Sequence, residues 1–172
     1  MKLQRALAIG LKISEILAPL CERIEIAGSI RRVRPEVGDL DLVILPKPGQ
    51  LAAIKARCQE KCAPIRDGEQ NCIYRLELSD GTPLQVDIFF ARPAISDLLQ
   101  TVPGNFGTLL LCRTGSKEHN IYLVEHAKRL GLRWNPYRGV INEQQQVIAS
   151  ETEADVFQAL QLPFIKPEER ER

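Results

Sequence analysis

The sequence lacks the features that announce a strongly charged, membrane-spanning or repetitive protein. Its 172 residues carry a formal net charge of only +1, so no overall basic field points to a nucleic-acid partner. No apolar run approaches the roughly 20 residues that a helix needs to cross a bilayer, and no membrane partner is expected. Repeats and low-complexity tracts are absent as well. The 44% apolar content instead predicts a globular chain with a substantial core.

Histidine is also scarce, which bears on the five cysteines. Cys58 and Cys62 are four residues apart and Cys72 is near them, but His119 and His126 lie far downstream. A fourth zinc ligand is therefore hard to find, and a structural zinc site is not expected. The odd number of cysteines, with no signal peptide, predicts reduced thiols in a cytoplasmic, reducing compartment.

Charge is uneven in the second half of the chain. Residues 110–149 hold six basic and three acidic residues, a net charge of +3, whereas residues 150–172 hold three basic and six acidic residues, a net charge of −3. The basic zone is where nucleic-acid contacts are expected. The length suits one domain or two small ones.

The stretch from Gly28 to Leu45 carries the most specific pattern. Asp39 and Asp41 open an apolar strand, and residues two apart on a strand face the same way, about 7 Å apart or less. Two carboxylates this close attract a hard divalent cation such as Mg²⁺. Ahead of them, a Gly28-Ser29 turn and three arginines provide groups that bind phosphate. The combination indicates phosphoryl or nucleotidyl transfer.

The remaining pattern predicts an alternation of helices and strands. Expected helices cover residues 3–21, 50–62, 94–100, 105–113, 117–130 and a last helix ending at Leu160, with a capping box at Ser150–Glu153. Expected strands cover residues 23–27, 39–45, 73–78 and 84–90. Short strands are expected within 132–141 and 146–148, around turns at Asn135-Pro136 and Asn142-Glu143, and Ser29 is expected to cap a short helix reaching Arg32. The tail from Pro163 to Arg172 is expected to be extended.

Asp87 is the one charge in the apolar strand 84–90. An unpaired buried carboxylate costs several kcal/mol, so Asp87 needs a partner. The pair formed by Asp39 and Asp41 is the available one, which predicts three carboxylates on two neighbouring strands.

These motifs together resemble family X DNA polymerases. The matching residues are Gly28-Ser29-x-Arg31-Arg32 with Gly38-Asp39-x-Asp41, then Val86-Asp87-Ile88, then Thr114-Gly115-Ser116 before a helix with Asn120, and finally Gly131-Leu132, Tyr137 and Asp155-Val156-Phe157. The resemblance implies an α+β fold: a nucleotidyltransferase palm over residues 1–92, with a mixed sheet and helices on one side, and a small α+β nucleotide- and DNA-binding subdomain over residues 93–172.

The resemblance also implies a role for individual residues. Asp39 and Asp41 would bind two Mg²⁺ ions, for which Mn²⁺ can substitute, and Asp87 would complete the catalytic metal site. The triphosphate, the sugar and the base would be held by Ser29, Arg32, Gly38, Gly115 and Asn120. Lys117 and Arg133 stand where template or nucleotide contacts are plausible. The implied partners are gapped or primed DNA and deoxynucleoside triphosphates, and the expected state is a monomer.

Some positions depart from the family pattern. Cys112 and Arg113 stand where repair members have two aromatics that reject ribonucleotides, and Pro136 stands where an acidic residue is expected. The chain begins at the palm's first helix, so neither an N-terminal lyase domain nor a helix-hairpin-helix element is expected.

Four functions remain open at this point. The leading one is a template-directed DNA polymerase that fills short gaps in DNA repair. The others are a template-independent transferase acting on nucleic-acid ends, a small-molecule or protein nucleotidylyltransferase, and a non-catalytic nucleic-acid-binding module. The basic stretch from Arg113 to Arg138 argues against the third, and the three aspartates argue against the fourth.

Overall fold

The computed structural model describes residues 1–96 and 101–171, which fold into two compact units. Unit 1 is Met1–Phe90 and unit 2 is Ala91–Arg172. The division falls two residues before the boundary that the sequence predicted. In the described part of the chain, no helix is both long and apolar enough to cross a membrane.

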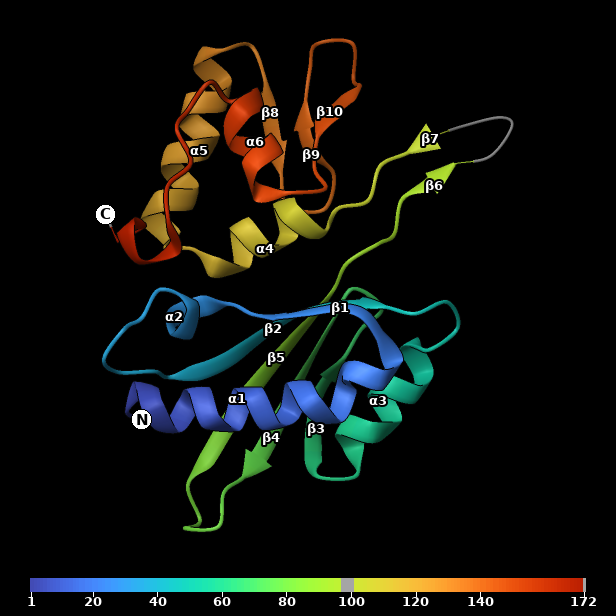
Figure 1. Cartoon of the computed structure of the whole chain (residues 1–172), viewed down its shortest axis with the longest axis vertical. Helices are drawn as coiled ribbons and strands as arrows, with labels where there is room; N and C mark the ends of the chain where they lie inside the picture. Colours follow the sequence, from blue (N-terminus) through green and yellow to red (C-terminus); the bar gives the residue numbers. More distant parts are fainter. Residues whose placement is uncertain (97–100, 172) are drawn as a thin grey trace. The chain divides into compact units, whose positions relative to one another are not determined.

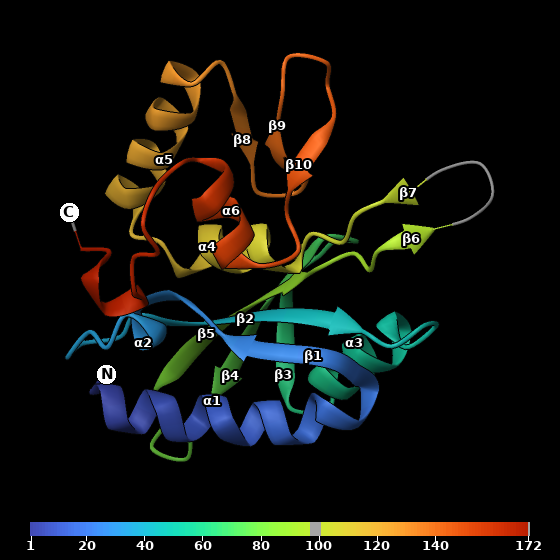
Figure 2. The ribbon, with the colours of Figure 1, turned by 45° about the horizontal axis from the view of Figure 1, so that its top comes forward.

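Unit 1 is a five-stranded sheet with helices on one face (Figures 1 and 2). The strand order is β1-β2-β5-β4-β3; β2 and β5 are parallel and the other neighbours are antiparallel. The elements are α1 Leu3–Leu17, the 3-10 turn η1 Ala18–Leu20, β1 Cys21–Ile26, α2 Gly28–Arg31, β2 Asp39–Pro46, α3 Leu51–Gln59, β3 Cys62–Asp67, β4 Asn71–Glu77 and β5 Pro83–Phe90. The α+β prediction, with a mixed sheet and helices on one side, is confirmed.

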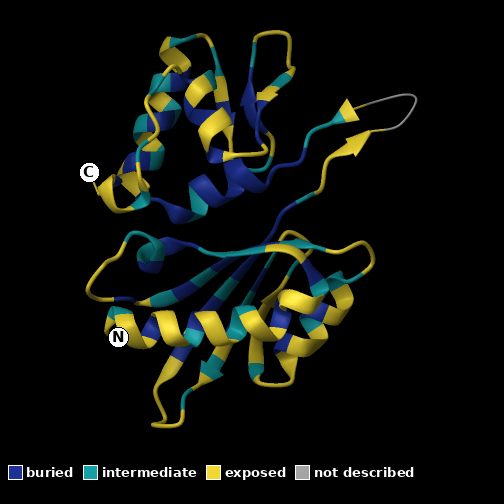
Figure 3. Ribbon diagram, in the orientation of Figure 1, coloured by how far each residue is buried: buried dark blue, intermediate teal, exposed yellow. Residues whose placement is uncertain are grey.

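Alternation of apolar residues along the strands explains why one face is covered. Leu40, Leu42 and Ile44 of β2 pack in one core cluster with residues of α1 and α3, such as Leu17 and Ile54. Successive side chains of a strand point to opposite faces, so the residues between them lie on the face away from these helices. Figure 3 shows buried residues concentrated along the strands and exposed residues along the outer side of α1.

Unit 2 packs three helices against a small sheet of order β10-β9-β8. Its core includes Trp134, whose indole Nε1 donates a 2.7 Å hydrogen bond to the Thr108 hydroxyl. The elements are β6 Ile95–Ser96, β7 Thr101–Val102, α4 Phe106–Thr114, α5 Lys117–Arg129, β8 Arg133–Asn135, β9 Gly139–Ile141, β10 Val147–Ala149, α6 Glu153–Ala159 and the 3-10 turn η2 Pro167–Glu169.

Several predicted elements are wrong in kind or in extent. Cys62 begins strand β3 rather than ending a helix, and β3 pairs with β4. The predicted helix 94–100 is instead, at Ile95–Ser96, a strand paired with β7, while residues 97–100 lie outside the described residues. Helix α2 begins at Gly28 with Ala27 as its N-cap, so Ser29 does not cap it.

The caps of the later helices are also informative. Thr152, not Ser150, caps α6, because its hydroxyl accepts the amide of Asp155 at 3.1 Å. The Ser150 hydroxyl instead donates to the Gly104 carbonyl. At the end of α5, Gly131 has φ +71°, the left-handed conformation that a helix C-terminus commonly requires.

Candidate active site

The three aspartates lie on the face of the unit 1 sheet opposite the helices, which we call the carboxylate face. In the parallel pairing of β2 with β5, Asp41 is the register partner of Asp87, and Asp39 is the partner of Gln85. Because Asp39 is two residues before Asp41, its side chain points to the same face. The structure therefore brings together the residues that the sequence placed on neighbouring strands.

These carboxylates are half-buried rather than sequestered in the core. Val86 and Ile88 on either side of Asp87 pack in the core, whereas Asp87 itself points away from it. The Gln85 side-chain amide donates a 2.9 Å hydrogen bond to Asp87 Oδ1. Asp87 is therefore half-buried and already has one hydrogen-bond donor, because alternation along the strand turns its carboxylate away from the core.

The backbone of Gly28 lies close to the carboxylate of Asp41. A Cβ added to this residue would lie 1.9 Å from Asp41 Oδ2, and Gly28 has φ +58°. The amide of Ala27 also donates to the Asp41 carbonyl at 2.9 Å, which ties the end of β1 to β2. Only glycine satisfies both the backbone conformation and the space. Sequence reasoning assigned Gly28 only to a phosphate-binding Gly-Ser turn and did not foresee its close approach to Asp41.

The proposed phosphate-binding residues surround this turn. The Ser29 hydroxyl is buried and has no hydrogen-bond partner among the described residues. Arg32 is half-buried at the end of α2. Gly38, in contrast, is exposed, and an added Cβ would contact nothing within 4 Å. A need for glycine is therefore visible at Gly28 and not at Gly38.

The loop between α2 and β2 is held by the start of the chain. Val37 and Met1 exchange hydrogen bonds, with the Val37 amide donating to the Met1 carbonyl at 2.8 Å and the N-terminal amine donating to the Val37 carbonyl. Lys2 Nζ lies 2.6 Å from the Glu36 carboxylate, and this pairing lowers the pKa of Glu36. These contacts fix the segment that leads into Asp39.

The carboxylate face offers oxygen donors of the kind that a divalent metal prefers, but in the described structure they are not gathered into a metal site. Three carboxylates on adjacent strands offer the oxygen ligands that Mg²⁺ prefers. Within the described residues, no three Asp, Glu, His or Cys side chains form a group that could hold a metal ion. Metal binding by Asp39, Asp41 and Asp87 therefore stays a prediction.

In unit 2, the Thr114–Ser116 turn joins α4 to α5. Gly115 is buried with φ +72°, and the Ser116 hydroxyl caps α5 by accepting a hydrogen bond from the amide of His119 at 3.2 Å. Asn120 lies in the first turns of α5, where its Nδ2 donates to the Cys112 carbonyl at 2.8 Å. Its Oδ1 is buried and meets no hydrogen-bond partner in the described chain.

The two predicted DNA contacts differ in their surroundings. Lys117 is exposed at the start of α5. Arg133 is exposed on β8, and its guanidinium donates to the Gln145 side-chain oxygen. Nothing in the structure tests their predicted role in DNA binding.

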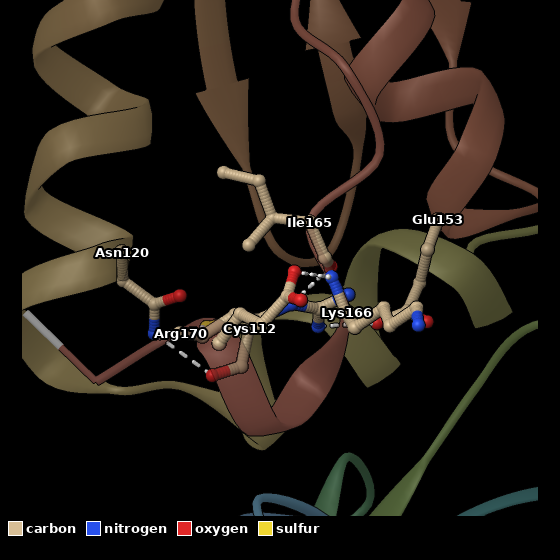
Figure 4. A network of polar contacts seen from close by, with 7 residues as sticks. Cys112, Asn120, Glu153, Ile165, Lys166 and Arg170 are labelled. Atoms are coloured by element: carbon tan, nitrogen blue, oxygen red, sulfur yellow. Dashed lines mark hydrogen bonds and ion pairs between the residues drawn. The ribbon is translucent and has the colours of Figure 1, made fainter.

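Arg170 is a structural residue that the sequence did not reveal. It is fully buried in unit 2, where its Nη1 lies 2.8 Å from Glu153 Oε1 and its Nε donates to the Ile165 carbonyl (Figure 4). Its guanidinium also faces the ring of Phe157 at 5.4 Å. The tail is therefore folded against unit 2 instead of extended.

The same residue fixes the Thr114–Ser116 turn. The Arg170 carbonyl accepts the Ser116 amide at 3.2 Å and the Ser116 hydroxyl at 2.7 Å. The tail is thus joined to the turn by two hydrogen bonds and to α6 by a buried ion pair. The position of Gly115 consequently depends on the last residues of the chain.

At the positions that depart from the family pattern, Cys112 and Arg113 both have neighbours within unit 2. Burial raises the pKa of the Cys112 thiol. Arg113 Nη2 donates to the Tyr137 hydroxyl at 2.8 Å, and the guanidinium lies 5.7 Å from that ring. Arg113 thus joins α4 to the turn between β8 and β9.

Comparisons with known proteins agree with this architecture. The family model of the DNA polymerase beta thumb matches residues 109–171. The chain is 30% identical over 168 residues to the DNA polymerase/3'-5' exonuclease PolX of Bacillus subtilis, covering 96% of this chain and 28% of that protein. The chain therefore spans little more than a quarter of the length of this relative.

Solved structures show the same fold. Two structures of Leishmania infantum polymerase beta, a ternary P/T complex and a ternary gap complex, match with TM-scores of 0.79 and 0.80 at 20% identity. Both matches cover 100% of this chain, and they cover 77% and 71% of the respective polymerase chains. Together with the match to the thumb model and the sequence similarity to PolX, they confirm the predicted resemblance to family X DNA polymerases.

Proposed function

We propose that this chain is a DNA-directed DNA polymerase that transfers deoxynucleotides to a primer 3′-hydroxyl, with short-gap filling in DNA repair as its task. The observation that carries the proposal is the register of Asp41 with Asp87 on parallel strands, with Asp39 on the same face and the Gly28-Ser29 turn against Asp41. Carboxylates beside groups that bind phosphate are the arrangement that nucleotidyl transfer needs.

Metal ions would contribute part of the chemistry. Two Mg²⁺ ions held by Asp39, Asp41 and Asp87 would activate the attacking oxygen and stabilise charge on the leaving pyrophosphate. Asp87 would accept the proton of the primer 3′-hydroxyl, and the hydrogen bond from Gln85 holds its carboxylate in one orientation.

Residues of the α2 turn would bind the triphosphate. The buried Ser29 hydroxyl, which has no partner among the described residues, would donate to a phosphate oxygen. Arg32 would offer its guanidinium to the same group and neutralise charge as it develops. In unit 2, Gly115 would pack on the nucleotide sugar and Asn120 would contact the base.

This function implies DNA as the partner and a particular cellular compartment. We propose that the chain works as a monomer on gapped or primed DNA and that Lys117 and Arg133 contact the DNA. The five cysteines are free thiols, which supports a reducing compartment.

Primer extension tests the proposal. Gapped, recessed and single-stranded DNA would each be offered one deoxynucleotide at a time, with Mg²⁺ or Mn²⁺. Addition of only the complementary nucleotide on primed or gapped DNA is the expected result. Addition that ignores the template would replace the proposal with a template-independent transferase, and no addition to any substrate would contradict both.

An Arg32→Ala variant tests the phosphate assignment separately. Loss of a guanidinium that binds the triphosphate should raise the KM for the nucleotide or lower kcat, while DNA affinity changes little. Unchanged kinetic constants would show that Arg32 does not bind the triphosphate.

A further inference from the structure

A groove of about 540 Å³ lies within unit 2, between the segment that leads out of β7 and the hairpin formed by β9 and β10. Its lining includes Arg92 and Arg138, Gln145 and Gln146 of the hairpin loop, and the aliphatic residues Val102 and Ile148. The groove is separate from the Thr114–Ser116 turn and from Asn120, which are not part of its lining.

The charge of this groove is positive and locally uncompensated. No acidic side chain belongs to its described lining, and neither Arg92 nor Arg138 forms an ion pair with a described residue. Arg92 Nη2 donates to the Pro103 carbonyl at 3.1 Å, while its buried Nε meets no acceptor in the described chain. In a chain with a net charge of +1, two such guanidiniums in one groove indicate an anionic ligand.

A third guanidinium lies at the rim. Arg133 of β8 donates to the side-chain oxygen of Gln145, which itself lines the groove. The glutamine side chains add amide donors and acceptors without adding negative charge. The three guanidiniums thus come from separate elements, the segment before β6, the turn between β8 and β9, and β8 beside the β9–β10 loop, which fits a chain of phosphates better than one isolated phosphate.

Apolar side chains share the groove with these cations. Ile148 is 48% exposed, and Val102 is half-buried beside it in the lining. A duplex presents mainly phosphates and sugars to a surface of this kind, because its bases are stacked inside. An unpaired strand presents phosphates to the arginines and also base faces that can pack on the aliphatic side chains.

We propose that this groove binds the backbone of single-stranded DNA, so that it holds an unpaired part of the template strand. The inference rests on the proposed function, because a polymerase that fills gaps must hold unpaired template next to the primer end. Arg92 and Arg138 contact successive phosphates, and Val102 and Ile148 support the unstacked bases.

Fluorescence anisotropy tests this inference. The binding of a labelled oligothymidylate to the 172-residue chain is measured in the absence of nucleotide and metal. Arg138→Gln removes one phosphate contact of an exposed side chain, and Arg129→Gln in the last turn of α5 is the matched control. The affinity for a single strand varies with salt concentration to a power of about 0.7 for each phosphate contact. With about 1 M salt as the reference, the loss of one contact in R138Q should therefore weaken binding about eightfold at about 50 mM salt. R129Q should bind as the unaltered chain does.

Two further comparisons make the inference specific. A duplex of the same length should lose less affinity than the oligothymidylate on the R138Q substitution, and Gln146→Glu should weaken oligothymidylate binding by placing a negative charge in the groove. Equal binding by R138Q and R129Q, or equal losses for duplex and single strand, would overturn the assignment.

This experiment also separates the inference from the proposed function. Oligothymidylate binding that depends on Arg138, in a chain that extends no primer, would support the groove and refute the polymerase proposal. If the chain extends a primer but R138Q leaves its oligothymidylate binding unchanged, only the role assigned to the groove would be refuted.

Discussion

The buried ion pair between Arg170 and Glu153 predicts a large and local loss of stability. Arg170 is 0% exposed and Glu153 is 8% exposed, so the substitution Glu153→Gln would remove the carboxylate that pairs with this buried guanidinium. Removing one partner of a buried pair typically costs about 3–5 kcal/mol, whereas exposed pairs contribute about 0–1 kcal/mol. We therefore expect E153Q to lower the free energy of unfolding of unit 2 by about 3 kcal/mol or more.

Trp134 provides the assay, because it is the one tryptophan of the chain and lies in the core of unit 2. Urea unfolding followed by its fluorescence reports the unit that holds the pair. Glu125→Gln, an exposed substitution on α5 in the same unit, is the control and should change the unfolding free energy by less than about 0.5 kcal/mol.

A second variant tests whether the charge imbalance is the cause. Replacing both partners with apolar residues, as in the double variant E153L/R170M, should recover much of the loss, because no unpaired charge remains. An E153Q protein that unfolds within about 1 kcal/mol of the unaltered chain would refute the reasoning.

Three further predictions concern unit 1. Gly28→Ala would place a methyl group against Asp41 in a left-handed backbone conformation, so primer extension should fall sharply while the circular dichroism spectrum persists. The amide of Thr82 and the guanidinium of Arg5 lower the pKa of Asp80 from 3.8 to about 2. The ionised Asp80 therefore stabilises unit 1 fully above pH 3.8, and this contribution is lost as the pH falls toward 2. In the Asp80→Asn variant, the free energy of unfolding should depend less on pH in this range. Burial raises the pKa of Cys58 to about 12, so very little of its thiol is ionised at pH 8. Its reaction with a disulfide reagent should therefore be slow and limited by the rate at which unit 1 opens.

Local patterns predicted most of unit 1 because its strands alternate and its turns carry clear signals. The strand with Asp39 and Asp41 and the strand with Asp87 were both visible in the sequence, and β2 and β5 contain them. Their parallel register could not be derived, since it depends on pairing between segments more than 40 residues apart. Strand β3 escaped prediction because it contains Pro64 and charged residues and lies at the edge of the sheet.

Unit 2 was harder to predict because its decisive contacts are distant in sequence. The tail is rich in proline and charge, which predicts a solvated segment, yet Arg170 is buried through contacts with Glu153 and Ser116. The groove near Arg92 and Arg138 likewise joins residues 46 positions apart. Neither arrangement leaves a periodic signal in the sequence.

The most direct test of the central claim is nucleotide addition by Asp87→Asn. This substitution keeps the shape of the side chain but removes the negative charge that stands in register with Asp41. Glu77→Gln, at the other end of strand β4 beside β5, is the control for a lost carboxylate in the same hairpin. The account predicts that D87N folds and adds no nucleotide to a primer while E77Q extends it normally; extension by D87N at the rate of E77Q would contradict it.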